Sequence, residues 1–250
     1  MRINSAALTL NSLNQLGYAG YGKDFMEENG SVTFGGADTG DVYYNGAAVA
    51  DMPLQTTAAA VELVSDSVQD DMLLGGTGAW TVMVAGLDEN YNVATETFIM
   101  DGAVEVVGTQ LFIRVLGIIV LTAGTNETNV GNIDIQAVGG GQVWDRVIAG
   151  EGRNQHSLIT VPANKTFHIV HWAFTSNALV AQTFNIMVRS YGGAWIVQER
   201  RFTYFGGSVG EVVPVQIAGP ILPKTDIKMR VTVGGAASIS SHMAGFLCDV

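Results

Sequence analysis

The sequence is nearly free of cysteine, since Cys248 is the only one among 250 residues. An intrachain disulfide is therefore impossible, and stability must come from burial of apolar side chains and from association between chains. No histidine and asparagine pattern accompanies Cys248, so we interpret it as a small buried hydrophobe of the last strand and not as a nucleophile.

Charge is also scarce, and positive charge most of all. Charged residues make up 14% of the chain, where about 25% is usual. There are 12 Lys and Arg against 23 Asp and Glu, which gives a net charge of -11. Phosphates and anionic lipids need clustered basic residues, so we predict no nucleic-acid partner and no membrane partner. So little charge indicates either a surface covered by other subunits or a Ser/Thr/Asn exterior around a large core.

Long apolar runs are missing as well. The most apolar run, Val115 to Leu121, is far below the ~20 residues of a membrane helix. The N-terminal segment has only Arg2 as a basic residue and asparagines among its apolar residues, so it does not resemble a signal peptide. We expect a soluble protein made in a cytoplasm without secretion.

Glycine-punctuated strand patterns fill most of the chain. Between Gly75 and Ile135, β-branched residues at Thr81–Ala85 are followed by turn residues, and Val93–Met100 then alternates as a return strand. About a dozen such segments follow one another at the spacing typical of sandwiches and barrels. The predicted fold class is all-β: an antiparallel β-sandwich, jelly-roll-like in one form, with an irregular N-terminal arm.

Three consecutive glycines, Gly139 to Gly141, mark the clearest internal break, because they permit unusual backbone angles. We therefore predict an N-terminal arm over residues 1–55, a first β-unit over 56–138 and a second over 139–250. The alternative is that both units pack as one sandwich.

The predicted arm mixes glycines with aromatic residues and shows no regular period. Such a mixture cannot form a compact core alone, so it predicts a segment lying over a neighbouring surface, with an irregular cap on its own sandwich as the alternative. The candidate interface anchors are Tyr18, Tyr21, Phe25, Tyr43 and Tyr44.

Metal ligands are not evident. His168 and His171 lie three apart on an expected strand, where alternation sends them to opposite faces, so we expect structural roles. Asp66, Asp70 and Asp71 could offer oxygens to calcium, but they lack the EF-hand spacing, and we interpret them as solvated loop acids. We predict no metal and no cofactor.

Catalytic motifs are also lacking. The run Gly75–Gly78 has no Walker lysine and precedes a strand, and no Gly-x-Ser-x-Gly elbow occurs. Two carboxylates for glycoside hydrolysis would meet only in space, and nothing singles out the candidates Glu96, Glu105 and Glu199. We predict that the protein is not an enzyme.

A carbohydrate-binding adhesin stays open as an alternative. It would need exposed tryptophans beside loop acids, and the candidates are Trp80, Trp144 and Trp195. The basic pair Arg200–Arg201 on an expected strand fits either a solvated face or a charge pair across an interface.

Six turn-and-strand motifs of this sequence resemble motifs found in a known class of proteins. They are Gly76-Thr77-Gly78-Ala79-x-Thr81-Val82, Gly86-Leu87-Asp88-x-x-Tyr91-Asn92, Ala123-Gly124-Thr125-Asn126, Gly131-Asn132-Ile133, Val161-Pro162-Ala163-Asn164-Lys165-Thr166 and Pro223-Lys224-Thr225-Asp226-Ile227. With them, roughly residues 60–250 resemble virion structural proteins of tailed, particularly marine, bacteriophages. The resemblance implies an assembly component without catalysis.

From this resemblance we expect a capsid decoration (cement) protein, made in the host cytoplasm and carried in the virion. Its expected partners are the major capsid protein and copies of itself, with a homotrimer favoured by head symmetry. A tail, neck or fibre component is the alternative within the same class.

Overall fold

The computed structural model describes residues 24–44, 51–204, 209–213 and 220–250. The secondary structure of this part of the chain is entirely β. It contains no helix long and apolar enough to cross a membrane. The fold class predicted from the sequence, all-β with antiparallel sheets, is confirmed.

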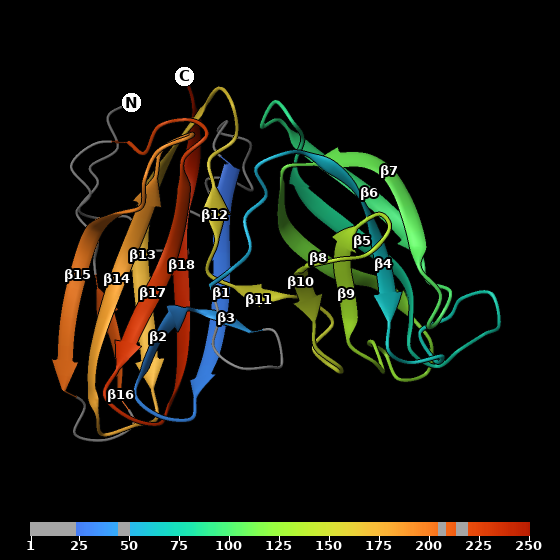
Figure 1. Cartoon of the computed structure of the whole chain (residues 1–250), viewed down its shortest axis with the longest axis horizontal. Helices are drawn as coiled ribbons and strands as arrows, with labels where there is room; N and C mark the ends of the chain where they lie inside the picture. The colour runs from blue at the N-terminus through green and yellow to red at the C-terminus, as the bar shows by residue number, and fades with distance from the viewer. Residues whose placement is uncertain (1–23, 45–50, 205–208, 214–219) are drawn as a thin grey trace, which may run out of the picture.

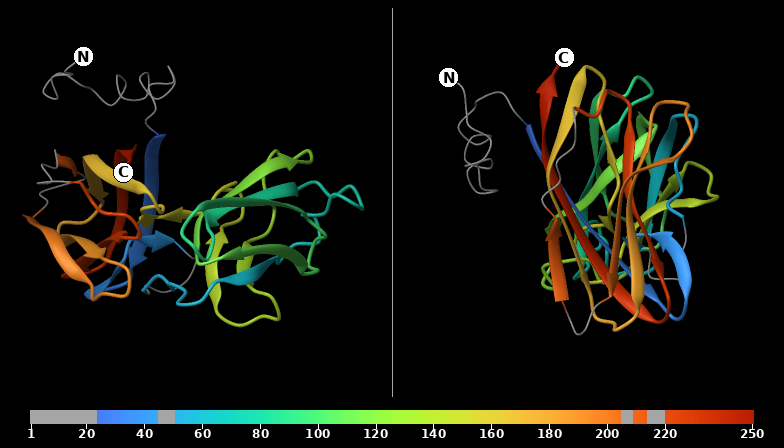
Figure 2. Two further views of the ribbon diagram at one scale, coloured as in Figure 1. Left: turned by 90° about the horizontal axis from the view of Figure 1, so that it is seen from above. Right: turned by 90° about the vertical axis from the view of Figure 1, so that its left-hand side faces the viewer.

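The strands form two lobes that lie side by side (Figures 1 and 2). The larger lobe is built from β1 (Asp24–Phe34), β2 (Asp38–Asp41), β3 (Tyr43–Tyr44), β11 (Gln155–His156), β12 (Ile159–Thr160), β13 (Lys165–Ser176), β14 (Ala181–Arg189), β15 (Ile196–Tyr204), β16 (Val209–Val213), β17 (Asp226–Val233) and β18 (Ala237–Asp249). The smaller lobe is built from β4 (Ala59–Ser65), β5 (Ala79–Leu87), β6 (Val93–Ile99), β7 (Val106–Phe112), β8 (Arg114–Ala123), β9 (Ile133–Ala137) and β10 (Val143–Val147).

The larger lobe is a jelly roll. Its two sheets have the orders β1-β18-β13-β16 and β12-β17-β14-β15, and β2 also pairs with β17. When β2 and β12 are counted together as the second strand, the lobe has eight strands in chain order. The first pairs with the eighth (β1 with β18) and the second with the seventh (β2 and β12 with β17). The third pairs with the sixth (β13 with β16) and the fourth with the fifth (β14 with β15), all antiparallel. These are the pairs of one long hairpin wrapped around a core, which defines the eight-stranded double-sheet jelly roll.

The second strand of this jelly roll is interrupted. β2 pairs with Arg230–Val233 of β17, and β12 pairs with Asp226 and Ile227 at the start of the same strand. The smaller lobe occupies the chain between these two pieces (Figure 1). We therefore call residues 51–154 the inserted lobe, and residues 24–44 with 155–250 the jelly-roll lobe.

Each lobe has its own hydrophobic core. In the jelly-roll lobe the inward residues of both sheets pack together around Trp172, and the Phe174 and Phe184 rings stack with centroids 3.8 Å apart. In the inserted lobe, the sheets β10-β9-β4-β7 and β6-β5-β8 enclose a separate cluster that includes Phe98 and Phe112. Because the clusters share no residue, each lobe meets the main condition for folding as a unit.

The division of the chain differs from the one predicted. Residues 24–44 are not an irregular arm, because β1 pairs with β18 along its whole length. A Cβ on Gly30 would lie 2.6 Å from the Val42 carbonyl oxygen, so glycine is required where β1 approaches the start of the insertion. Residues 1–23 lie outside the described part of the chain.

Gly139–Gly141 is not a domain boundary. All three glycines have positive φ, from 85° to 123°, and they connect β9 to β10, which are neighbours in one sheet. The glycines serve a tight connection that only their backbone freedom permits. The boundaries of the inserted lobe lie instead near residues 51 and 154, where the chain leaves and rejoins the jelly roll.

The excised jelly roll should fold by itself. Tyr44 and Gln155 face each other as the last antiparallel pair of β3 and β11, so an Asn-Gly turn can replace residues 45–154 and close a two-residue hairpin. We expect a β-rich circular dichroism spectrum and one cooperative urea transition, since the core of this lobe stays intact. A product without a cooperative transition would contradict the independence of the two cores.

Candidate functional site

The two lobes are joined by a buried ion pair. Arg114 of β8 donates from Nε and Nη2 to both carboxylate oxygens of Asp226 of β17, each at 2.9 Å. The two side chains are only 5% and 4% exposed. Arg189 and Thr160 donate to the same carboxylate at 2.6 and 2.7 Å. Burial alone would raise the pKa of Asp226, but the guanidinium groups outweigh it and hold that pKa below its ordinary value.

A tyrosine turn of the inserted lobe seals one end of this junction. Tyr91 adopts a left-handed backbone with φ of 68°, and its carbonyl accepts a hydrogen bond of 2.7 Å from Ala163 N of the jelly-roll lobe. Its ring packs edge-on against Tyr191 at 5.4 Å, and Lys224 Nζ lies 5.4 Å from both ring centroids. The chain enters the inserted lobe once and leaves it once. The contacts of Tyr91 fix the two lobes to each other in addition to these two covalent connections.

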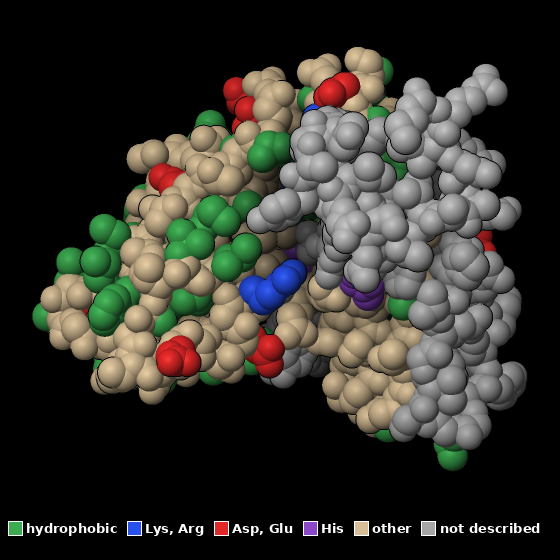
Figure 3. Space-filling model, turned by 180° about the vertical axis from the view of Figure 1, so that it is seen from behind, with side chains coloured by type: hydrophobic (Ala, Val, Ile, Leu, Met, Phe, Trp, Pro, Cys, Tyr) green, Lys and Arg blue, Asp and Glu red, His purple; other side chains and the backbone are tan. Residues whose placement is uncertain are grey.

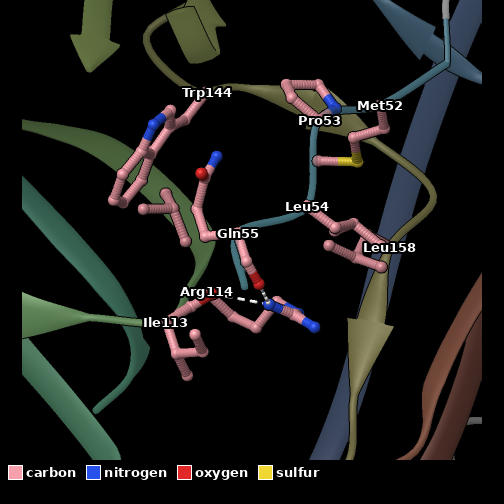
Figure 4. A pocket seen from close by; sticks show the side chains of 9 residues that line it. Met52, Pro53, Leu54, Gln55, Ile113, Arg114, Trp144 and Leu158 are labelled. Atoms are coloured by element: carbon pink, nitrogen blue, oxygen red, sulfur yellow. Dashed lines mark hydrogen bonds between the residues drawn. The ribbon is translucent and has the colours of Figure 1, made fainter. Parts of the chain in front are cut away.

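The part of the junction beside Arg114 has no room for an organic ligand. The cavity beside Arg114 measures about 10 Å³ and is lined by Gln55, Trp144 and Leu158 among others (Figure 4), which is about the space of one water molecule. Gln55 Nε2 is buried without a partner among the described residues. Arg114 Nη1 donates to the Gln55 carbonyl at 2.6 Å. The cavity beside Arg114 therefore belongs to a structural joint between the lobes.

A buried acid and histidine form the second polar contact of the junction. Asp145 Oδ2 lies 3.4 Å from His156 Nε2 and accepts from Asn154 Nδ2 at 2.5 Å. Burial raises the pKa of Asp145 to about 7. Burial, helped by the charge of Arg153, lowers the pKa of His156 to about 4. His156 is therefore a neutral imidazole at pH 7, and its Nδ1 accepts from Leu158 N at 3.0 Å.

The exposed outward residues of strands β6, β5 and β8 are uncharged. Arg114 of β8 lies in the row of Leu87 and Val93 but is buried against Asp226, and Arg153 pairs with Ile119 at the edge of β8. The inward residues of these strands, such as Val82, Val84 and Phe98, are buried, and the residues between them face outward. Figure 3 shows hydrophobic side chains gathered on this lobe. The outward residues are Thr81, Met83, Ala85, Val93, Thr95, Thr97, Ile99, Gly117, Ile119 and Thr122. We call this surface the uncharged face; it is the candidate functional site.

Exposed apolar side chains distinguish this face from a normal polar exterior. Val93 is 70% exposed, Ile99 50% and Ile119 38%. Ile99 and Ile119 lie in neighbouring rows on either side of β5, whereas Val93 lies at the other end of β6 beyond Thr95 and Thr97. By contrast, the outer side of β17 in the jelly-roll lobe carries the partly exposed Arg230, which pairs with Asp41 and Asp51, beside the buried Lys228. The two lobes therefore present surfaces of different chemistry.

The structure separates the predicted interface aromatics. Tyr43 is buried at 6% exposure and packs with Met52 and Leu158 at the lobe junction, so it is not an exposed anchor. Phe25 and Tyr44 lie on β1 and β3, but their side chains are outside the described part. Tyr18 and Tyr21 also lie outside the described residues.

Asp66 is exposed, as predicted for a loop acid, and accepts from Asn132, but the other two loop acids are more buried than predicted. Asp70 is fully buried, and its carboxylate accepts from Ser65 Oγ at 2.6 Å and from three backbone amides. Asp71 is also buried, and it accepts from Leu74 N at 2.9 Å. These carboxylates organise the loops after β4 and before β5. Within the described residues, no three His, Cys, Asp or Glu side chains are grouped as a metal site requires.

Strand β13 has a bulge between His168 and His171. The pairing of β13 with β18 shifts between Ile169 and His171, so the strict alternation that predicted opposite faces does not hold there. His168 stacks on Phe246 with ring centroids 5.0 Å apart. The side chain of His171 is outside the described part. Cys248 lies on β18 and is half-buried.

The remaining candidates are not brought together. Glu96 accepts from the backbone amides of Thr109 and Gln110, whereas Glu199 lies on β15 of the other lobe. Trp144 is buried, and Trp195 is half-buried beneath Arg189 and Lys228.

Trp80 is also half-buried, and its Nε1 donates to the Gly76 carbonyl. Arg200 Nε donates to Asn185 Oδ1 at 2.9 Å. Glu105 is exposed on the connection before β7. The platform of clustered, exposed tryptophans that a carbohydrate-binding adhesin would need is therefore not formed by these three side chains.

The comparisons with known proteins find only distant likeness. The VP2 subviral particle of infectious bursal disease virus matches with 9% identity and a TM-score of 0.25, covering 90% of this chain and 72% of that chain. The Gx strain of the same virus matches with 11% identity and a TM-score of 0.27, covering 90% and 71%. The jelly-roll assignment rests on the strand pairing above and not on these scores. No protein-family model and no curated protein matches the sequence.

Breaking the buried pair of Arg114 and Asp226 should lower the free energy of unfolding far more than breaking the partly exposed pair of Arg146 and Asp134. Replacing Arg114 by Met leaves the Asp226 carboxylate buried with a single guanidinium, and we expect urea unfolding to show a loss of about 3 kcal/mol or more. Arg146→Met is the matched control, because its pair with Asp134 is 26% and 22% exposed and should cost at most about 1 kcal/mol. Equal losses in the two variants would contradict the role assigned to Arg114.

The Asp145–His156 pair predicts opposite pH slopes in two variants. The raised pKa of Asp145 contributes stability that is complete below about pH 4 and is lost as the pH rises to about 7. The lowered pKa of His156 contributes stability that is complete above about pH 6.5 and is lost as the pH falls to about 4. In the native sequence these slopes cancel between about pH 4 and 6.5.

Relative to the native protein, Asp145→Asn should gain stability with rising pH and His156→Gln should lose it. Each slope should approach about 1.4 kcal/mol per pH unit over that window. Urea unfolding at four or five pH values measures both. Slopes of the same sign would refute the assignment of a raised and a lowered pKa.

Proposed function

We propose that the protein is a non-enzymatic structural component of a virus particle, specifically a capsid decoration protein of a tailed bacteriophage. Its partners are the major capsid protein and further copies of itself, assembled as a homotrimer. The uncharged face of the inserted lobe is the observation that carries this proposal.

The size of the uncharged face supports a role in a repeating assembly. Three strands spaced by ~4.8 Å and seven residues of ~3.3 Å give roughly 300 Å², whereas a stable interface buries about 800 Å² per partner. At ~25 cal/mol per Å², such a contact barely offsets the cost of association by itself. Repetition across a lattice or within an oligomer makes weak contacts of this kind effective.

Charge supports the same role. With a net charge of -11, copies of the chain repel each other at long range. The uncharged face is a surface where contact brings no carboxylates together. Such a chain stays soluble at low concentration and associates only through defined contacts.

The jelly-roll topology agrees with this function at the level of fold. Jelly rolls build viral capsid and lectin domains among others, so this agreement is an analogy, and function must be argued from surfaces. A tail, neck or fibre component uses the same kind of surface, and the binding experiment distinguishes it from a head protein.

Binding to purified, undecorated heads of the encoding phage tests the proposal. We expect the native protein to co-sediment with heads at a saturable stoichiometry, and Ile99→Glu to bind at least tenfold less, because a carboxylate on the uncharged face must be desolvated. Ile196→Glu, at 57% exposure on β15 against 50% for Ile99, is the matched control and should bind normally.

Two results would change the conclusion. If the native protein does not bind heads but binds purified tails, the protein is a tail component. If Ile99→Glu and Ile196→Glu bind heads equally well, the uncharged face is not the contact surface.

A further inference from the structure

An open hollow lies where edge strand β1 meets the inserted lobe. Its volume is about 350 Å³, within the range of ligand sites. The lining residues are Asn29, Gly30, Ser31, Arg153, Gln155, Ser240 and Ser241. Each of these residues except Gly30 has a polar side chain, so the hollow suits a polar ligand.

Arg153 stands out among the basic residues. The other lysines and arginines with described side chains each have a partner: Asp226 for Arg114 and Arg189, Asp134 for Arg146, Asp249 for Lys165, Asn185 for Arg200, Asp41 for Lys228 and Arg230, and two tyrosine rings for Lys224. Arg153 is exposed and has no ion pair or hydrogen bond of its side chain within the described residues. In so acidic a chain, an unpaired guanidinium at a hollow indicates a site for an anionic group.

The backbone around Arg153 is held in place. Val120 N donates to the Gly152 carbonyl at 2.8 Å, and Asn154 N donates to the Ile118 carbonyl at 3.1 Å. Both flanking residues are therefore tied to β8. Only the side chain of Arg153 is left to adapt to a ligand, so little order has to be imposed on binding.

The opposite wall of the hollow supplies hydroxyl groups. Ser31 and Ser240 face each other across the β1–β18 pair. Ser31 Oγ donates to Gln155 Oε1 at 3.0 Å, and Gln155 Nε2 donates to Glu151 Oε2 at 2.6 Å. This chain sets the orientation of the amide and leaves the lone pairs of Ser31 Oγ available to a ligand hydroxyl.

We propose that this hollow binds a carboxylated saccharide of the uronic-acid type. Its carboxylate would lie on the Arg153 guanidinium, and its hydroxyl groups would bond with Asn29, Ser31 and Ser240. An acidic peptide side chain fits less well, because it offers a carboxylate on an apolar stem to a wall of hydroxyls. Glu151 repels any anion at this site, and it repels a phosphate dianion more strongly than a singly charged uronate carboxylate. The inference is independent of the proposed function.

Two matched ligands test the proposal by calorimetry and ligand-detected NMR. A glucuronate-containing tetrasaccharide should bind the full-length protein saturably, and its carboxyl-reduced form should bind about tenfold more weakly or less. Arg153→Gln should weaken binding of the acidic tetrasaccharide to the same extent. Arg200→Gln changes the net charge equally on the other lobe and should bind as the native protein does.

Several results would overturn the proposal. They are absence of saturable binding by the acidic tetrasaccharide, equal binding of both tetrasaccharides, equal affinity of Arg153→Gln and Arg200→Gln, and displacement of the saccharide by a polyglutamate peptide at lower concentration. Because Arg153 is exposed, its substitution should leave the circular dichroism spectrum and urea midpoint unchanged, and Ser240→Leu gives a second variant that fills the hollow.

Discussion

The backbone pairing along β17 is the constraint on which the rest of the molecule depends. β17 lies inside its sheet, so both of its edges need partners, and one edge is covered by two segments from opposite sides of the insertion. The jelly roll cannot close until β2 and β12 both reach this strand. The inserted lobe thereby has its two ends held together at β3 and β11, and Arg114 meets Asp226 at the end of the same ladder.

Much of the fold could be predicted from residue patterns, because alternation and turn chemistry are local. β5 and β6 lie where the residue patterns at Thr81–Ala85 and Val93–Met100 predicted strands. The missed strand β1 contains Glu27, Glu28 and Gly30, which suit an edge strand but hide its alternation. The insertion was missed because β2 and β12 form one strand only through pairing with β17, and no local signal reports a contact so distant in sequence.

The candidate site was only half visible in the sequence. The alternation of Val93, Thr95, Thr97 and Ile99 was recognised as a strand, but its apolar residues point outward, and a sequence does not say which side of a sheet faces water. Arg153 carried no motif at all. Its significance depends on the absence of a partner among the described residues and on β1 and β18 beside it, which are far from it in the chain.

A rigid junction gives the two surfaces a fixed relation. The ion pair between Arg114 and Asp226 costs desolvation and is weak evidence for stability in itself, but removing one partner leaves a buried charge. Such a pair adds little to the stability of the native arrangement of the lobes. It acts mainly by disfavouring other arrangements, in which one of the two charges would be buried without its partner. For the proposed role on a repeating lattice this property matters, because a hinge between the lobes would spread the position of the uncharged face and reduce the effective concentration of every further contact.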